Sequence, residues 1–562
     1  MADIRNNFIG IKSPNPFWLA SAPPTDKAYN VERAFKAGWG GVVWKTLGEE
    51  GPPVVNVNGP RYGAIWGADR RLLGLNNIEL ITDRDLQTNL REMKQVKMNW
   101  PDRALIASIM VPCVEESWKA ILPLVEETGA DGIELNFGCP HGMSERGMGS
   151  AVGQVPEYIE MVVRWCKQYT RMPVITKLTP NITDIRKPAR AAHAGGTDAV
   201  SLINTINSIT GVDLDSFAPQ PTIDGKGSHG GYCGPAVKPI AMNMVAEIAR
   251  DPETRGLPIS GIGGITTWRD AAEFMALGAG NVQVCTAAMT YGFKIVQEMI
   301  AGLENWMDEK GHASLSDIIG RATPNVTDWQ YLNLNYVAKA HIDQDACIKC
   351  GRCHIACEDT SHQAITSMVD GVRHFEVIEA ECVGCNLCVN VCPVEGCITM
   401  APLAAGVVDQ RTGKPMPNPS FELPDSTAAT TIAIKYLDIR GRETGPFDIR
   451  FDPDGALQQE NKQILDQFWT SWIAFDSGGN RGLVYFTQML SYRCAIKEVH
   501  YSLNGSALDK EIKMPPCDAK DPYAIPSDYQ PYFKVKDDVK SMAVQVTYTD
   551  GTKSPVREYK RQ

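Results

Sequence analysis

The sequence lacks any run of about 18 consecutive apolar residues, so no segment is expected to span a membrane. Its N-terminus, MADIRNNFIG, contains no apolar stretch of the kind found in secretory signals. Basic residues are not in excess, since the formal net charge is −11, and this balance argues against a nucleic-acid partner. We therefore expect a cytoplasmic protein that binds neither membranes nor nucleic acids.

A G-x-G-x-x-G motif at the start of a Rossmann unit is also missing, so the chain has no visible NAD or FAD domain. Cysteine, by contrast, is abundant. Eight of the 16 cysteines lie between Cys347 and Cys392, which is not how the cysteines of a disulfide-stabilised scaffold are distributed. Clustered thiols in a cytoplasmic chain indicate metal binding.

Short apolar runs alternate with helical stretches, such as residues 114–128 and 157–169, in the first part of the chain. The eight runs lie at 17–21, 41–45, 104–109, 131–136, 173–178, 198–203, 257–262 and 281–285. Apolar strands that alternate with helices are typical of a parallel sheet buried on both faces, and eight such units match a (β/α)8 TIM barrel. The length of 562 residues suggests about two to four domains. We assign the barrel to residues 1–335; a doubly wound sheet is the alternative.

Two cysteine blocks predict an iron–sulfur module in residues 336–400. Both blocks, 347–357 and 382–392, have the C-x2-C-x2-C-x3-C spacing of bacterial 2[4Fe-4S] ferredoxins. Three thiolates of one block and the last cysteine of the other hold each cluster in this arrangement. The predicted sets are Cys347, Cys350, Cys353 and Cys392, and Cys382, Cys385, Cys388 and Cys357. Two zinc sites are the alternative; Cys397 falls outside the pattern and is interpreted as a structural thiol.

Such clusters pass single electrons, so any bond chemistry belongs to the barrel, whose active sites lie at the C-terminal ends of the strands. The polar residues at these ends are Lys45, Thr46, Asn136, Lys177, Asn204 and Thr205. A lysine inside a barrel is costly without an anionic partner, so the two lysines favour an anionic cofactor. The turns at 261–264 and 285–286 are the expected phosphate-binding turns, and 230–234 is a further glycine-rich candidate.

A cysteine follows the fourth predicted strand on a glycine-rich loop. The Cys139 thiol, with a reference pKa of about 8.5, can exchange one proton with a flat substrate near neutral pH. This position indicates a general acid or base opposite a flavin. His141 is a second candidate, which either tunes Cys139 or forms hydrogen bonds within the loop.

These motifs resemble the dihydroorotate dehydrogenase superfamily and, within it, the flavin- and cluster-bearing subunits of bacterial NAD-dependent dihydropyrimidine dehydrogenases. The resemblance covers about residues 1–400. It is carried by residues 21–24 (SAPP), 44–46 (WKT), 77–81 (NIELI), 136–149, 176–184 (TKLTPNITD), 203–205 (INT), 237–240 (VKPI), 261–265 (GIGGI) and 282–285 (VQVC). Two positions depart from the usual family pattern, since Thr176 replaces alanine and Gly138 replaces serine.

The resemblance implies FMN-dependent interconversion of uracil or thymine and its 5,6-dihydro form. Cys139 would exchange a proton with ring C5 while the flavin exchanges a hydride with C6. Electrons would pass through two [4Fe-4S] clusters to a partner subunit that binds FAD and NAD(H), so a homo- or hetero-oligomer is expected. The implied FMN ligands are Ala20, Ser21, Lys45, Thr46, Lys177, Gly231, Gly264 and Thr286. The implied substrate ligands are Asn77, Glu79, Asn136, Asn204 and Thr205.

Three alternative functions stay open. A related ring or enone reductase with another substrate is favoured by Gly138 and by the extra C-terminal residues. A tRNA dihydrouridine synthase also has an Asn-x-Gly-Cys-Pro loop, but the acidic balance and the cysteine blocks argue against it. A pure electron-transfer subunit with an inactive barrel conflicts with the intact set of Cys139, Lys45 and Lys177.

Residues beyond 400 differ in composition. Residues 401–430 are rich in Pro, Gly, Ser and Thr and are expected to form a linker. In residues 431–562, the runs 496–504, 532–535 and 541–548 alternate apolar and polar side chains, which predicts a small β-rich, sandwich-like domain. A Thr-Asp-Gly turn signal follows the last run. Cys494 and Cys517 have no ligand spacing, and docking to a second copy or to the electron partner is the expected role.

Overall fold

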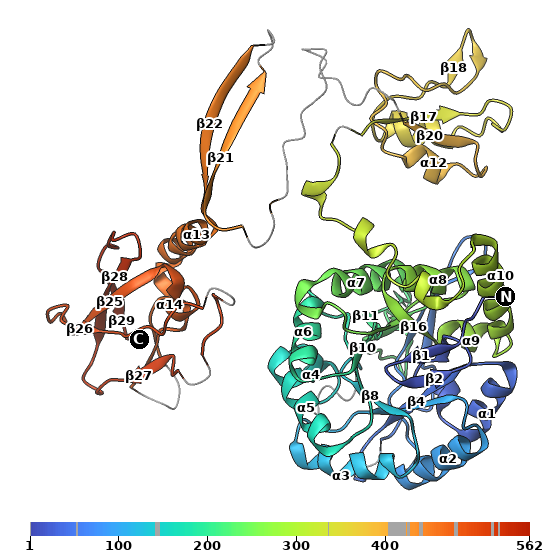
Figure 1. Ribbon diagram of the computed structural model, residues 1–562, viewed down its shortest axis with the longest axis horizontal. Helices are drawn as coiled ribbons and strands as arrows, with labels where there is room; N and C mark the ends of the chain where they lie inside the picture. Colours follow the sequence, from blue (N-terminus) through green and yellow to red (C-terminus); the bar gives the residue numbers. More distant parts are fainter. Residues whose placement is uncertain are drawn as a thin grey trace. The chain divides into compact units, whose positions relative to one another are not determined.

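The computed structural model describes residues 2–51, 54–140, 147–334, 336–402, 423, 427–437, 442–476, 482–518, 522–526 and 529–561. The chain divides into two compact units, Met1–Asp328 and Trp329–Gln562 (Figure 1). The boundaries predicted at 335/336, 400/401 and 430/431 all lie within the second unit, so this division does not test them and they stay predictions.

The first unit is a closed barrel of eight parallel strands in the order β10-β15-β16-β3-β4-β7-β8-β9. In chain order the strands are β3 (Phe17–Leu19), β4 (Gly41–Leu47), β7 (Ala104–Ile109), β8 (Gly132–Asn136), β9 (Val174–Lys177), β10 (Ala199–Leu202), β15 (Ile259–Ile262) and β16 (Ala279–Val284). Each strand overlaps one of the eight apolar runs, so the predicted TIM barrel is confirmed. The runs are apolar because nearly every strand residue is buried between the barrel interior and the helices.

Helices surround the barrel (Figure 1). They are α1 (Ala28–Ala37), α2 (Leu86–Asn99), α3 (Glu115–Glu126), α5 (Pro156–Tyr169), α6 (Arg186–Ala194), α7 (Lys238–Arg250), α8 (Trp268–Ala276) and α10 (Ile295–Lys310), with the short α4 (Ser150–Gly153) and α9 (Thr286–Tyr291). Each long helix buries one apolar stripe; in α5 this stripe is Ile159, Val162, Val163 and Cys166. The two helices predicted at 114–128 and 157–169 are confirmed as α3 and α5.

A second, four-stranded antiparallel sheet in this unit has the order β11-β14-β6-β5. Its strands are β5 (Tyr62–Trp66), β6 (Leu72–Asn77), β11 (Ile206–Ser208) and β14 (Gly230–Cys233). Close packing in this sheet requires a glycine, because a Cβ on Gly74 would lie 1.9 Å from the Tyr232 hydroxyl oxygen. The sheet brings Asn77 and the adjoining Glu79 to the barrel cavity.

The cysteine blocks of the second unit lie in a compact segment closed by the antiparallel pair β17 (Ala338–Ile342) and β20 (Ile398–Pro402). It contains the short helices α11 (Arg352–His354) and α12 (Leu387–Val391) and the two-stranded sheet β18 (Met368–Val369) and β19 (Val372–Arg373). Its buried core is small and consists largely of cysteines with Ile342, Ile365, Phe375 and Ile398.

The described C-terminal residues form two further sheets, a hairpin, a long helix and the short helix α14 (Thr487–Ser491). One sheet has the order β23 (Ala474–Phe475), β24 (Leu483–Tyr485), β27 (Tyr532–Lys534), and the other β26 (Lys510–Glu511), β25 (Ile496–Leu503), β28 (Ser541–Tyr548), β29 (Arg557–Lys560). The three predicted strands are confirmed as β25, β27 and β28, and the Gly551 N–H closes the predicted turn on the Tyr548 carbonyl oxygen. The sequence analysis did not anticipate the hairpin of β21 (Thr430–Leu437) and β22 (Glu443–Phe451) or the helix α13 (Pro453–Gln467).

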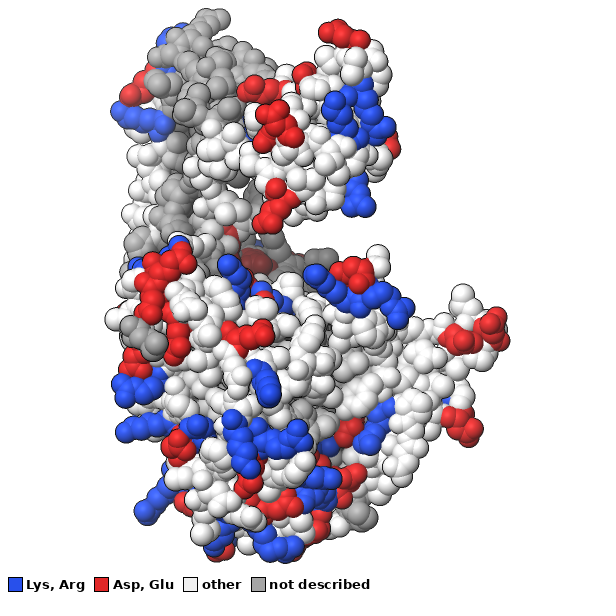
Figure 2. Space-filling model, turned by 90° about the vertical axis from the view of Figure 1, so that its right-hand side faces the viewer, with Lys and Arg blue, Asp and Glu red and all other residues white. Residues whose placement is uncertain are grey.

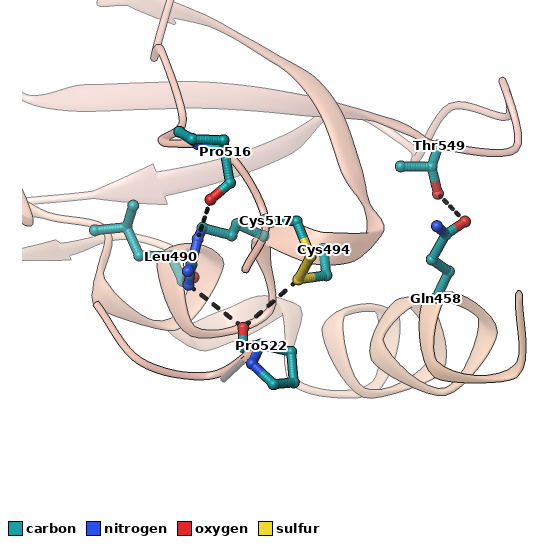
Figure 3. Close-up of a disulfide and its surroundings, with 8 residues drawn as sticks. Gln458, Leu490, Cys494, Pro516, Cys517, Pro522 and Thr549 are labelled. Carbon is teal, nitrogen blue, oxygen red and sulfur yellow. Dashed lines mark hydrogen bonds between the residues drawn. A yellow bond between two sulfur atoms is a disulfide. The ribbon is translucent and has the colours of Figure 1, made fainter. Parts of the chain in front are cut away.

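Cys494 and Cys517, which had no assigned pairing, form a disulfide across 23 residues of sequence (Figure 3). Arg493 beside it is buried, and its guanidinium donates to the carbonyl oxygens of Leu490, Pro516 and Pro522 at 3.0–3.4 Å. The disulfide and these hydrogen bonds join Pro516, Cys517 and Pro522 to the residues just before β25.

Most of the predicted linker, 401–430, lies outside the described residues; Ala401 and Pro402 belong to β20, and Thr430 begins β21. Among the described residues, no helix is both long enough and apolar enough to cross a membrane. The cytoplasmic location stays a prediction.

Candidate active site

A cavity opens at the C-terminal ends of the barrel strands and holds about 1300 Å³ of empty space, its open mouth included. The predicted site residues that line it are Ala20, Ser21, Lys45, Thr46, Asn77, Glu79, Asn136, Cys139, Lys177, Asn204, Thr205, Gly264 and Thr286. Gly231 stands behind the lining, where its carbonyl oxygen accepts a hydrogen bond from Asn77 Nδ2 at 2.9 Å. His141 lies outside the described residues. The structure thus brings together nearly all the residues that the sequence analysis selected.

Both cavity lysines have carboxylate partners within the protein. Lys45 Nζ lies 2.8 Å from Glu79 Oε1, and Arg61 binds the other oxygen of Glu79 at 2.9 Å. Lys177 Nζ lies 3.2 Å from Glu134 Oε1, whose side chain is fully buried. The argument that these lysines need an anionic cofactor for their charge is therefore wrong, because the protein supplies the negative charge.

Glu134 is a residue that the sequence analysis did not select, although it lies two positions before Asn136 on β8. Ser201 Oγ and Gln283 Nε2 donate to its Oε2 at 2.8 and 3.0 Å. Alternation along a strand places residues 134 and 136 on one face, and this pattern is a signal that could have identified Glu134. The buried Glu134–Lys177 pair supports the floor of the cavity.

A chain of hydrogen bonds orients the asparagines. Asn136 Nδ2 donates to Thr46 Oγ1 at 3.0 Å, and Asn136 Oδ1 accepts from Asn204 Nδ2 at 3.0 Å. Asn204 Oδ1 in turn accepts from the Thr205 backbone N–H at 2.8 Å. Thr46 Oγ1 also contacts the hydroxyls of Ser21 and Ser108. The ends of five barrel strands, β3, β4, β7, β8 and β10, are thereby connected through short side chains.

Steric crowding explains why the residue before Cys139 is a glycine. A Cβ on Gly138 would lie 2.4 Å from Asn204 Cβ and 2.6 Å from Asn204 Nδ2. Asn204 therefore occupies the space that a side chain at position 138 would need. The position of Asn204, and with it the Asn204–Asn136 hydrogen bond, therefore depends on a glycine at position 138.

Cys139 lies at the edge of the cavity with 8% of its surface exposed. Its buried neighbours are Ile81, Met110 and Met148, so one side of the thiol faces an apolar wall. Gly149 packs closely against it, since Gly149 has φ +58° and a Cβ there would lie 2.7 Å from the Cys139 carbonyl oxygen. Cys139 therefore lies between the cavity and this apolar wall.

Two further cysteines line the cavity, Cys233 and Cys285. Burial, followed by the nearby Cys233 thiol, raises the pKa of Cys285 to about 12. Burial also raises the pKa of Cys233. Both thiols are therefore protonated at neutral pH and act as small neutral wall groups.

Glycines at two turns let backbone segments approach each other closely beside the cavity. Gly234 and Gly264 have φ +92° and +70°. A Cβ on Gly264 would lie 2.9 Å from the Gly234 carbonyl oxygen and 2.7 Å from Lys238 Cβ. These turns expose backbone toward the cavity without intervening side chains.

The eight module cysteines surround two smaller cavities. Cys347, Cys350, Cys353 and Cys392 line the first cluster cavity, and Cys357, Cys382, Cys385 and Cys388 line the second. These are the two sets predicted from the spacing.

Over the described residues, no three His, Cys, Asp or Glu side chains converge on a point suited to a single metal ion. Thiols around an open space fit a cube-shaped cluster better than zinc, which needs four ligands converging on one point. Cys397 also lines the first cavity.

Charged side chains of both signs are mixed on the face shown in Figure 2, where Lys and Arg lie among Asp and Glu. The described residues on this face therefore show no continuous basic surface of the kind that nucleic acids bind.

Comparisons with known proteins agree with this site. A family model described as "Dihydroorotate dehydrogenase" matches residues 4–307, and one described as "4Fe-4S dicluster domain" matches residues 340–400. The chain is 42% identical over 398 residues to the Escherichia coli K12 "NAD-dependent dihydropyrimidine dehydrogenase subunit PreA", covering 71% of this chain and 95% of the relative.

Two further relatives match over the barrel length. Identity is 41% over 321 residues with the chloroplastic dihydropyrimidine dehydrogenase (NADP(+)) of Arabidopsis thaliana, covering 56% of this chain and 75% of the relative. It is 38% over 319 residues with the dihydroorotate dehydrogenase B (NAD(+)) catalytic subunit of Pyrococcus abyssi, covering 56% and 98%. The chain therefore belongs to the dihydroorotate dehydrogenase family and is an oxidoreductase, related to the dihydropyrimidine dehydrogenases, that carries a 4Fe-4S domain.

Proposed function

We propose that this chain interconverts uracil or thymine and its 5,6-dihydro form, with FMN in the barrel cavity. Electrons pass through two [4Fe-4S] clusters to a partner subunit that binds FAD and NAD(H). The observation that carries the proposal is the convergence of Cys139 with the hydrogen-bonded amides of Asn136 and Asn204 in one cavity. The names of the bacterial and plant relatives support pyrimidine chemistry.

Two features of the cavity suit FMN. Gln283 Oε1 is buried without a hydrogen-bond partner in the described part of the chain, and Gln283 lines the cavity, so a donor on a ligand would satisfy it. The Gly234 and Gly264 turns present backbone without side chains to the cavity, which suits a phosphate bound by backbone N–H groups. The proposed ligands are Ala20, Ser21, Lys45, Thr46, Lys177, Gly231, Gly264 and Thr286. When bound, FMN supplies hydride exchange at ring C6.

The chain's own residues hold the ring and move the proton. Asn136 and Asn204 suit a cyclic ureide because each amide offers a donor and an acceptor. Asn77, Glu79 and Thr205 complete the proposed substrate set. The Cys139 thiol gives or takes the proton at ring C5, and its apolar neighbours keep water from one side of it. His141 is proposed to assist Cys139 on the same loop.

The electron route is proposed from the cysteines and from the absent Rossmann motif. Each cluster cavity would hold one [4Fe-4S] cluster on its four thiolates. The Escherichia coli relative is named as a subunit of an NAD-dependent enzyme. A separate nucleotide-binding subunit would therefore exchange electrons with NAD(H) in place of this chain.

A related ring or enone reductase is the second candidate function, and Gly138 favours it. Serine at this position would overlap Asn204 where it now lies. The pocket beside Cys139 thus differs from the usual family pattern, which is where a change of substrate would be expressed.

Turnover of the full chain with uracil, thymine and a reduced artificial electron donor tests the proposal. We expect the 5,6-dihydro product, bound FMN, and about eight irons per chain, as two cubanes require. Reduction of cyclic enones but of neither pyrimidine would support the second candidate instead. Rapid flavin reduction by NADH in the isolated chain would contradict the separate nucleotide-binding subunit.

A further inference from the structure

The iron–sulfur segment contains an internal structural repeat. Its first half comprises the residues around the first cavity, 342–353 with Cys392 and 396–398. Its second half comprises those around the second cavity, 377–388 with Cys357 and 363–365. In the first half the Asp343 N–H donates to the Cys397 carbonyl oxygen at 2.8 Å. In the second half the Ile378 N–H donates to the Ala364 carbonyl oxygen at the same distance. Asp343 lies four residues before Cys347, and Ile378 lies four residues before Cys382. The next pairs also correspond, since Ile342 faces Ile398 and Val377 faces Ile365.

Backbone angles give the same alignment. Left-handed φ values recur at matched positions, which are Lys349 and Gly384, Gly351 and Asn386, and Gln363 and Gly396. The last pair directly precedes Ala364 and Cys397. These two residues therefore occupy equivalent positions, and the repeat carries a methyl group in one half and a thiol in the other.

Each of the two side chains points at a cluster cavity. Ala364 lines the second cavity and Cys397 the first, and each is 2% exposed. Cys397 lines this small cavity together with Cys347 and Cys392. Its S–H donates to the Asp343 carbonyl oxygen at 3.7 Å, and because the hydrogen turns about the Cβ–Sγ bond, the same S–H can be directed to a sulfur in the cavity instead. Cys397 is thus a fifth thiol beside four proposed ligands, whereas the second cavity has four cysteines and the thioether of Met400, which has no hydrogen to donate.

The backbone makes a further distinction. In the second half the Ala364 N–H donates to Cys357 Sγ at 3.3 Å. The Cys397 N–H is instead directed to the Val394 carbonyl oxygen at 3.3 Å. The first half therefore lacks this backbone hydrogen bond to its fourth cysteine, and the Cys397 side chain is the group positioned to replace it.

We propose that the Cys397 S–H donates a hydrogen bond to a ligand sulfur of the first cluster and thereby raises the reduction potential of that cluster. This inference rests on the two clusters of the proposed function. Reduction adds one electron and one negative charge to the cluster, so its sulfurs become stronger acceptors. A donor at this point stabilises the reduced state more than the oxidised state. Cys397 is a tuning residue and not a fifth ligand.

A reciprocal pair of substitutions in the full, cluster-loaded chain tests the proposal by redox titration followed by electron paramagnetic resonance. In Cys397→Ala, one of the two midpoint potentials is expected to fall by about 59 mV, which is a tenfold change for a one-electron couple, while the other is unchanged. Cys397→Ser keeps a donor and retains most of the original potential. Ala364→Cys adds a thiol to the second cavity and raises the other potential.

Unchanged potentials in Cys397→Ala with both clusters present would overturn the proposal, as would an equal shift of both. Loss of one cluster in both Cys397→Ala and Cys397→Ser would overturn it too, since Cys397 would then hold iron. If the unaltered chain carries two clusters but does not turn over pyrimidines, only the proposed substrate fails. If it carries no cubane clusters, the proposed electron route fails, and this inference fails with it.

Discussion

The barrel cavity and the cluster cavities differ in how their polar groups are satisfied. In the barrel, Lys45 pairs with Glu79 and Lys177 with Glu134, and the asparagines bond to each other, so the cavity is formed by the protein alone. In the iron–sulfur segment, the thiols face one another across open space within a small core. A preorganised site should outlast its cofactor, whereas a segment built around clusters should depend on them.

The largest expected effect comes from removing the clusters. The double variant Cys353→Ala and Cys388→Ala takes one proposed ligand from each cluster. We expect the backbone amides of residues 336–402 to lose nearly all of their protection against hydrogen exchange. The barrel strands should keep their protection because they form a separate unit. Hydrogen exchange followed by mass spectrometry measures both regions at once. A protected 336–402 segment without iron would show that the thiol core folds unaided.

The second-largest effect is expected on turnover alone, without a change in cofactor content. Cys139→Ala should lower turnover by about 10²–10⁴-fold while FMN and iron contents stay normal, since it removes the proposed proton donor. Cys166→Ala is the matched control, because this buried thiol lies on α5, away from the cavity lining. Near-normal turnover by the Cys139 variant with a pyrimidine would exclude the proton-transfer role.

Breaking the buried ion pair should cost stability. Glu134→Gln leaves the Lys177 ammonium buried beside a neutral amide, and the free energy of unfolding of the barrel should fall by about 3–5 kcal/mol. Asp69→Asn is the control, because its pair with Arg71 is solvent-exposed and should contribute under about 1 kcal/mol. Urea unfolding of the two variants compares them. Equal, small losses would mean that the barrel floor does not rely on this charge pair.

Much of the barrel could be predicted because strands buried on both faces leave apolar runs, and because chemistry gathers at their C-terminal ends. The two sets of cysteines that line the two small cavities followed from spacing alone. Glu134 was missed because its partners, Ser201 and Gln283, come from strands far away in the sequence. The Cys494–Cys517 pairing had no local signal, since two isolated cysteines 23 residues apart reveal nothing of their distance in space. Residues 430–467 were missed because neither the hairpin nor α13 buries a continuous apolar face.

The smallest effect is expected from removing the residues after 400, which lie beyond both family-model matches. A chain truncated near Asp425 should keep FMN, clusters and its rate with an artificial donor, because the cavity lining lies entirely within residues 20–291. If this part docks a second copy, the affinity of the truncated chain for itself should fall by at least about tenfold. If it docks the partner, the turnover rate with a low concentration of partner should fall by at least about tenfold. Light scattering and partner titration measure these two outcomes. Loss of the small-donor rate with FMN still bound would show that the C-terminal part helps to build the active site.

The disulfide between Cys494 and Cys517 gives the chain a biosynthetic constraint. If the eight module thiols hold the proposed clusters, they must remain reduced until they receive iron, whereas this pair must lose two electrons to join. An oxidant that acts before cluster insertion reaches the exposed module thiols Cys350 and Cys385 as well, because thiol–disulfide exchange favours accessible thiolates. The proposed clusters are therefore best inserted before the C-terminal pair is oxidised. Material purified under air before its clusters are complete would fold at its C-terminal end and stay inactive for electron transfer.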